Sequence, residues 1–431
     1  MFCLLWLSIL GLSQEKKNIF SLQEAIEIGM VNNKKLKISS VREEVSEIIE
    51  RDLKHEKLPD INFHTGFSIL SNIRQFEDGV FNTSTKYDVP RVQYDFTLSA
   101  SIPIYMGGRL NHEERKAEIN TEITELKTKK EARQLRMEII TGFLQVMHLR
   151  DQEELILEKM HEDSVNIKHI QALKENGVVT NNEVLRTILQ LSNHKMIFTT
   201  LENDIAILEH QIKTLIAFPE HEEFHISTDG LLSTTGIEGK LEDLVTEAFV
   251  KNEALLISIK EIDLRKLDKK ITKANQLPQI MGNGQYGYSY PNFMFFPPEA
   301  HLYRFGSIGI SVNVPLSNLY KNKEKMALAQ ENVTIAKLEV EEREEQIRHD
   351  VYMAYRKLEE AVEKTKIGAE AIEQSKENYR IVKLKYANQL SLITELIDAD
   401  NSYLEAQSNY ISLEINKQLK YYQLQYILGN L

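Results

Sequence analysis

Apolar and polar residues alternate along four segments of the chain. In residues 92–102 every second residue is apolar, and the residues between them are Gln, Asp, Thr and Ser. Residues 307–314 alternate in the same way, and shorter alternating segments begin at Ile61 and Ile280. A period of two places the apolar side chains of a strand on one face. The pattern therefore predicts four β-strands, at about 61–71, 92–104, 280–290 and 304–316.

Two much longer segments, about 109–176 and 320–387, have helical spacing. Their apolar residues recur every three, four or seven positions among Glu, Lys and Arg, as at Ile347, Val351 and Leu358. At 1.5 Å per residue, each helix would reach roughly 100 Å. This spacing predicts that the two helices pack against neighbouring helices in the manner of a coiled coil.

The two halves of the chain repeat each other. Two early landmarks recur 219 positions later, and two later landmarks recur 212 positions later. The pairs are Asn33 and Asn252, Pro59 and Pro278, Pro103 and Pro315, and Gly177 and Gln389. The seven-residue difference falls between the two strands of a half, where a loop tolerates a change in length. The chain is therefore a tandem duplication.

Each half has the order helix, strand, strand, long helix, helix, beginning with a helical stretch such as 22–55. We predict a first structural repeat at 15–218, an inter-repeat segment at 219–240 and a second repeat at 241–431. The first residues form an apolar run that resembles the hydrophobic region of a secretory signal, so we predict a signal peptide at 1–14. A buried N-terminal segment is the alternative. Cys3, the single cysteine, would leave with the signal.

Composition narrows the class of protein. The 431 residues are 42% hydrophobic, which is too apolar for disorder, and the net charge of −12 argues against a nucleic-acid partner. The sequence has no phosphate-binding loop and no nucleophile elbow, and no cofactor or metal is expected. The run from His221 to His225 matches the zinc-protease pattern H-E-x-x-H, but it follows Pro219 in a predicted loop or short strand. We therefore predict that the protein is not an enzyme.

The apolar face of the strands has two interpretations, a sheet packed on a core and a sheet facing lipid. Strands of about 11 residues, tilted near 45°, cover a band of about 25 Å, which is the height of an outer-membrane barrel. This length favours lipid. Four strands cannot close a barrel, and an open edge is unstable in lipid, so at least two copies must pool their strands.

These features together resemble the TolC family, which includes the OprM- and CusC-type outer-membrane factors. The resemblance rests on the duplicated order of elements, on Ser-Ile-Pro-Ile-Tyr-Met-Gly-Gly at 101–108, on Asn-Val-Pro-Leu-Ser at 313–317, and on the helix turns at Gly177 and Gln389. It implies a homotrimer in which a twelve-stranded transmembrane β-barrel continues into a periplasmic α-helical barrel. The implied function is the exit duct of a tripartite efflux or type I secretion system. Such a duct passively conducts cargo from an inner-membrane pump and a periplasmic adaptor.

The resemblance also places a gate at the helix turns furthest from the membrane. Glu395 and Asp398 fall at the positions of an acidic ring around the periplasmic opening. Tyr386 and Glu183 fall where a tyrosine and a carboxylate form a hydrogen bond that helps to close it. Two departures from the family pattern are that Gln389 replaces a glycine and that Ser391 stands where an arginine can occur.

The electrostatics of such a ring can be considered without the family. Two charges about 8 Å apart repel by about 2 kcal/mol at an effective dielectric constant near 20, so a ring of carboxylates should favour cations. The alternative is that Glu395 and Asp398 only solvate a helix surface. The alternative function is a periplasmic coiled-coil structural or adaptor protein, which leaves the apolar strand faces unexplained.

Overall fold

The computed structural model describes residues 19–77, 79–227 and 239–431. The predicted signal peptide lies outside the described residues, as does the middle of the inter-repeat segment. The chain divides into two compact units. The first consists of Met1–Val41, Leu126–Leu256 and Glu342–Leu431, and the second of Arg42–Glu125 and Ile257–Glu341.

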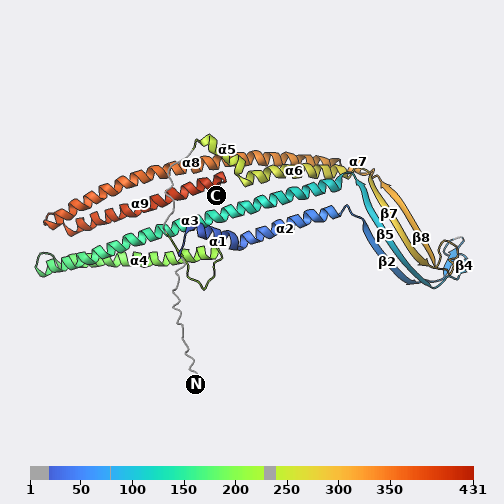
Figure 1. Ribbon diagram of the computed structural model, residues 1–431, viewed down its shortest axis with the longest axis horizontal. Helices are drawn as coiled ribbons and strands as arrows, with labels where there is room; N and C mark the ends of the chain where they lie inside the picture. The colour runs from blue at the N-terminus through green and yellow to red at the C-terminus, as the bar shows by residue number, and fades with distance from the viewer. Residues whose placement is uncertain (1–18, 78, 228–238) are drawn as a thin grey trace, which may run out of the picture. The chain divides into compact units, whose positions relative to one another are not determined.

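The elements follow the duplicated order (Figure 1). In the first repeat they are β1 (Ile19–Phe20), α1 (Leu22–Asn32), α2 (Lys34–His55), β2 (Asp60–Ile69), β3 (Ile73–Phe76), β4 (Ser84–Tyr87), β5 (Val92–Met106), α3 (Arg109–Glu175) and α4 (Asn181–Leu215). They continue with β6 (His225–Ile226), α5 (Leu241–Lys251), α6 (Glu253–Ala274), β7 (Gln279–Tyr290), β8 (Tyr303–Asn313), α7 (Asn318–Lys321), α8 (Lys323–Ala387) and α9 (Ile393–Leu428). No helix in the described part of the chain is both long and apolar enough to cross a membrane.

The helical stretch expected over residues 22–55 is two helices, because Asn33 leaves the helical conformation with ψ 128°. Its side-chain amide donates to the backbone oxygen of Leu215 at 2.7 Å and accepts from the nitrogen of Leu36 at 3.1 Å. Asn252 interrupts the second repeat in the same way and donates to the backbone oxygen of Ile427 at 3.4 Å. An asparagine that caps the following helix satisfies backbone groups left free at the break.

The core of the first unit lies where α1, α3 and α4 meet. Its fully buried side chains include Ile139 and Phe143 of α3, and they pack with Ala25 of α1 and Ile212 of α4. The short parallel pair β1 and β6 closes one side of this core. Phe20 there stacks on Phe224 with ring centroids 5.2 Å apart. This core packs the middle of α3 against the C-terminal part of α4, and these two helices carry one of the turns of the candidate site.

The four long strands form one antiparallel sheet in the order β2-β5-β7-β8 (Figure 1). The two repeats are joined at its centre, where β5 pairs with β7. The strand ends lie within three residues of those expected from the alternation. The largest difference is at β8, which ends before Pro315, whereas β5 continues past Pro103 through a register irregularity. A proline lacks the N–H that a regular ladder needs, so a strand stops there or is irregular.

The strand register places the apolar residues in rows on one face of the sheet. One row consists of Ile61, Ala100, Gly284 and Ile308. Ile308 is 95% exposed and Phe67 is 71% exposed, so this face is not covered by the rest of the chain. A sheet that packed on its own core would bury these side chains. The exposure therefore favours the lipid interpretation of the sheet.

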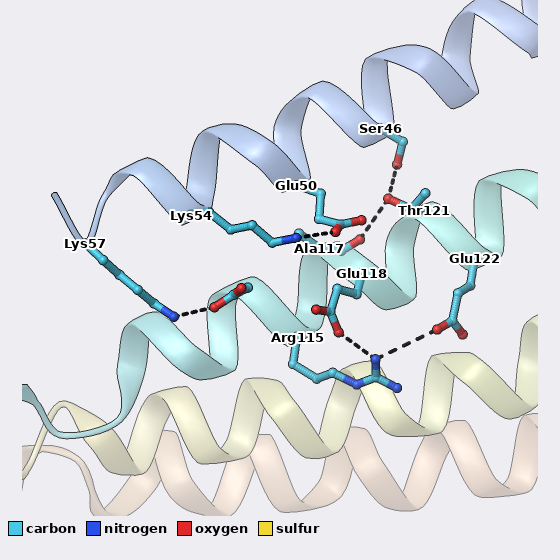
Figure 2. A network of polar contacts seen from close by, with 10 residues as sticks. Ser46, Glu50, Lys54, Lys57, Arg115, Ala117, Glu118, Thr121 and Glu122 are labelled. Atoms are coloured by element: carbon cyan, nitrogen blue, oxygen red, sulfur yellow. Dashed lines mark hydrogen bonds and ion pairs between the residues drawn. The ribbon is translucent and has the colours of Figure 1, made fainter.

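Polar contacts join α2 and the residues just after it to α3 in the second unit (Figure 2). The hydroxyls of Ser46 and Thr121 lie 3.3 Å apart, and Lys57 pairs with Glu114. Arg115 pairs with Glu118 of its own helix at 2.6 Å. Exposed ion pairs contribute little free energy each, about 0–1 kcal/mol. These contacts by themselves therefore stabilise the pair of helices only weakly.

Candidate gate at the helix turns

The turns between α3 and α4 and between α8 and α9 have the same backbone conformation. Gly177 and Gln389 both adopt left-handed φ angles, of 72° and 62°. The nitrogen of Val178 donates to the oxygen of Leu173 at 2.9 Å, and the corresponding bond from Leu390 to Lys385 is 2.8 Å. This is the Schellman arrangement that ends many helices. The glycine missing from the second turn therefore does not change the path of the chain.

A glutamate occupies the third position of the helix that follows each turn. Glu183 lies in the first turn of α4, and Glu395 lies in the first turn of α9. The N-terminus of a helix carries a partial positive charge that favours carboxylates there. The duplication thus places two negative charges at equivalent points behind the two turns.

Tyr386 near the end of α8 contacts Glu183 at the start of α4. Its hydroxyl donates to Oε2 of Glu183 at 3.3 Å. Burial, followed by the charge of Glu183, raises the pKa of Tyr386 to about 12. The phenol therefore stays neutral and able to donate at physiological pH. The hydrogen bond links the hairpin α8–α9 to the hairpin α3–α4.

An apolar cluster surrounds this hydrogen bond. Ile170 of α3, Val184 of α4 and Ile393 of α9 are buried together, and the Tyr386 ring packs against them. The two hairpins are therefore held together near their turns by apolar packing as well as by one polar contact.

Glu395 and Asp398 are both exposed on α9. The hydroxyl of Ser391 donates to Oε2 of Glu395, and the backbone oxygen of Asp398 accepts from Ser402 at 2.8 Å. In the sequence, Ser391 is notable only as a departure from the family pattern. Its position four residues before a glutamate at a helix start could have indicated the hydrogen bond. Exposed carboxylates at this position can attract cations.

The zinc-protease pattern does not form a metal site. His221 lies in a turn and His225 in β6, so the two rings do not share one face of a helix. Nδ1 of His225 lies 3.5 Å from Oε2 of Glu209, which also pairs with Arg150. In the described ranges there is no group of three or more His, Cys, Asp and Glu residues placed to hold a metal ion.

Solved outer-membrane channels have the same fold as this chain. The CusC structure matches with a TM-score of 0.79 and 12% identity over 95% of this chain and 92% of that chain. The outer-membrane channel OprN matches with a TM-score of 0.78 and 15% identity over 95% of this chain and 90% of that chain. VceC from Vibrio cholerae matches with a TM-score of 0.76 and 14% identity over 95% of this chain and 96% of that chain. At these identities the likeness shows the fold alone.

The sequence itself matches a family model described as outer membrane efflux protein, at residues 53–217 and 244–430. No curated protein matches the chain. One matched segment lies in each half of the chain, and together the two make up most of it. The chain therefore belongs to the outer membrane efflux protein family, whose members are non-enzymatic TolC-type channels of the outer membrane that extend into the periplasm.

Proposed function

We propose that the chain is one protomer of a homotrimeric duct with twelve strands in the outer membrane. The sheet carries this proposal, because within the described chain β2 and β8 each pair with one strand only. An unpaired strand edge is unstable in lipid, and further copies can pair both edges. A barrel of about eight strands is filled by its own side chains, whereas a wider one leaves a passage. Three copies of four strands give a twelve-stranded barrel, which is wide enough to leave a passage.

The helices of the second unit also support association of copies. Val45 and Ile48 of α2 are about half exposed, and so are Ile335 and Leu338 of α8. Their spacing of three residues places each pair on one helical face. Such apolar faces are unfavourable in water, and a neighbouring copy would cover them. The coiled-coil pattern read from the sequence is then satisfied between protomers as well as within one.

The duct itself has no means of using chemical energy. Its cargo would come from an inner-membrane pump through a periplasmic adaptor, and it would conduct that cargo passively. A periplasmic coiled-coil adaptor, the alternative function, has no need of an exposed apolar sheet, and family membership argues against it.

The helix turns form the closed periplasmic end of this duct. The hydrogen bond from Tyr386 to Glu183 and the apolar cluster behind it favour the closed state. Three copies of Glu395 and Asp398 form the acidic ring, which raises the local concentration of cations and disfavours anions. The hydrogen bond from Ser391 to Glu395 orients one carboxylate of each copy.

Conductance in planar bilayers tests the duct and the ring separately. Detergent-extracted wild-type protein should give small, cation-selective currents, and Glu395→Ala/Asp398→Ala should lose that selectivity or its block by divalent cations. Glu370→Ala removes an exposed carboxylate of α8 away from the turn and should behave as wild type. Channels whose selectivity survives the double change would refute the ring and keep the duct. A protein that is soluble without detergent and never conducts would refute the duct.

A further inference from the structure

Lys159 is a buried cation in the middle of α3, and only 4% of it is exposed. Its Nζ lies 2.7 Å from Oε2 of Glu162 on the same helix and 2.9 Å from Oδ1 of Asp400 on α9. It also lies 5.4 Å from the ring centre of Tyr379 on α8 and 5.5 Å from that of Tyr403 on α9. The ammonium is thus enclosed by two carboxylates and two aromatic rings.

Asp400 extends this cluster to a fourth helix. It is 8% exposed, and its second oxygen, Oδ2, accepts from Nε2 of Gln190 on α4 at 3.1 Å. One carboxylate of α9 therefore binds one side chain from each helix of the other hairpin. We call Lys159, Glu162, Gln190, Tyr379, Asp400 and Tyr403 the Lys159 cluster.

The surroundings keep Lys159 charged. Burial lowers the pKa of its ammonium, but the hydrogen bond to Glu162 and the charge of Asp400 outweigh burial and raise it above its ordinary value. Burial and the charge of Asp400 raise the pKa of Tyr379 to about 12, so its ring remains neutral beside the cation. The faces of neutral aromatic rings attract cations.

A buried ion pair is a poor way to add stability. Desolvation of the two charges offsets most of their attraction, and apolar residues of similar size often stabilise a fold as well or better. A buried pair is specific, however, because only one arrangement of its partners satisfies both charges. The Lys159 cluster therefore fixes the position of one hairpin against the other more than it strengthens the fold.

The contact within one hairpin differs from the contact between hairpins. One turn further along α3, Oδ2 of Asp163 lies 2.7 Å from Nδ1 of His194 on α4, and both side chains are buried. This pair ties α3 to α4 inside their hairpin. The Lys159–Asp400 pair instead joins α3 to α9, so it would break when the hairpins separate while the Asp163–His194 pair stayed intact.

The Lys159 cluster lies well behind the turns. Lys159 is about five helical turns before Gly177, and Asp400 is about three turns after Gln389. A fixed point at this distance limits how far the turns can move apart. The hydrogen bond between Tyr386 and Glu183 acts at the turns themselves and is a separate contact.

We infer that Lys159 is a positioning residue that holds the α8–α9 hairpin against the α3–α4 hairpin in the closed channel, and that loss of its bond to Asp400 lets the turns separate. The inference rests on the proposed function, because it assumes that separated turns open the duct.

The test uses Lys159→Met, which keeps most of the length of the side chain and removes its charge. Lys168→Met, at an exposed lysine of the same helix, is the matched control. Since the single change leaves Asp400 without a cation and can impair folding, Lys159→Met/Asp400→Leu is made in parallel, with apolar groups replacing both charges.

The first readout is the distance between spin labels at Val178→Cys and Leu390→Cys, which are exposed residues of the two turns, in a Cys3→Ser background. The second is the open fraction of single channels in planar bilayers. Both Lys159 variants should broaden the distance distribution to longer values and raise the open fraction at least about tenfold, while Lys168→Met matches wild type.

If Lys159→Met/Asp400→Leu assembles and keeps the wild-type distance distribution, the inference is overturned. In that case the Lys159 cluster would have only a structural role, because removing it would not move the turns. Separated turns without any conductance in wild type or variant would keep the positioning role and refute the duct. The distance measurement thus distinguishes failure of the inference from failure of the proposed function.

Discussion

Tyr386→Phe removes one hydroxyl from the candidate gate and leaves its apolar packing in place. The lost hydrogen bond, from Tyr386 to Oε2 of Glu183, is 3.3 Å long, compared with about 2.8 Å for a typical O–H···O bond. Hydrogen bonds to charged groups contribute about 1.5–3 kcal/mol. Because this bond is long and both side chains are only partly buried, so that water can solvate Glu183, we expect about 1 kcal/mol per protomer.

The effect on the channel depends on how the protomers open. In a trimer that opens in one concerted step, three lost bonds destabilise the closed state by about 3 kcal/mol, which raises the ratio of open to closed channels by about 100-fold. Independent opening of each protomer gives about a fivefold increase. Single-channel recording of the open fraction separates these cases. Tyr352→Phe, at an exposed tyrosine of α8, is the matched control.

The pH dependence of this contact follows from the raised pKa of Tyr386. Burial and Glu183 raise the pKa from 10 to about 12, so the hydrogen bond's contribution is fully present below pH 10 and is lost as pH rises through about 12. The increase caused by Tyr386→Phe should therefore be the same at pH 6 and pH 9. Open fractions for the Phe variant equal to those of wild type at both pH values would refute the closing role of the hydrogen bond.

Three further predictions concern stability and are checked by heat-induced unfolding of the detergent-solubilised protein. Gln389→Gly should stabilise the fold by about 1 kcal/mol, because a left-handed φ is costly for a residue with a side chain. Gly177→Ala should destabilise the fold by a similar amount for the same reason. Equal stability of both variants and wild type would contradict backbone strain at these two turns. Gly107→Ala should cost at least about 2 kcal/mol, because φ is 66° and the new Cβ would lie 2.6 Å from the backbone oxygen of Ala274, whereas Gly309→Ala, with open space around it, should change little. Asn33→Ala should cost about 1–2 kcal/mol through loss of its bonds to Leu215 and Leu36, and an unchanged melting temperature would mean that water replaces the amide.

The fold could be predicted largely from periodicity, because strands with one apolar face and long helices leave patterns that local sequence carries. The helix break at Asn33 could not be predicted, because helical spacing continues across it. The Asn33 side chain is bound there by the backbone oxygen of Leu215, about 180 residues away in the chain. The pairing of β5 with β7 is likewise a contact between the repeats, which period alone does not specify.

The candidate site was predictable only through the family resemblance. That resemblance pointed to Tyr386 and Glu183, and the two are in fact hydrogen bonded, but their role in closure remains a prediction. The Lys159 cluster has no signal in the sequence, because Lys159 and Asp400 lie in different repeats and because a lysine or an aspartate in a charged helix resembles a solvated residue. Only the packing of four helices distinguishes them from exposed charges nearby.

The identical spacing of the two hairpins has a geometric consequence for a trimer. Both hairpins end at a residue with a left-handed φ, Ala217 in the first and Gly429 in the second. The turn at Gly177 lies as many residues before Ala217 as the turn at Gln389 lies before Gly429. Hairpins of equal length end at the same depth. A trimer would therefore present six turns in one plane to any partner that approaches from the periplasm. The residue at the apex of these turns would alternate between a glycine and a glutamine. The partner would thus meet approximate sixfold rather than strict threefold symmetry.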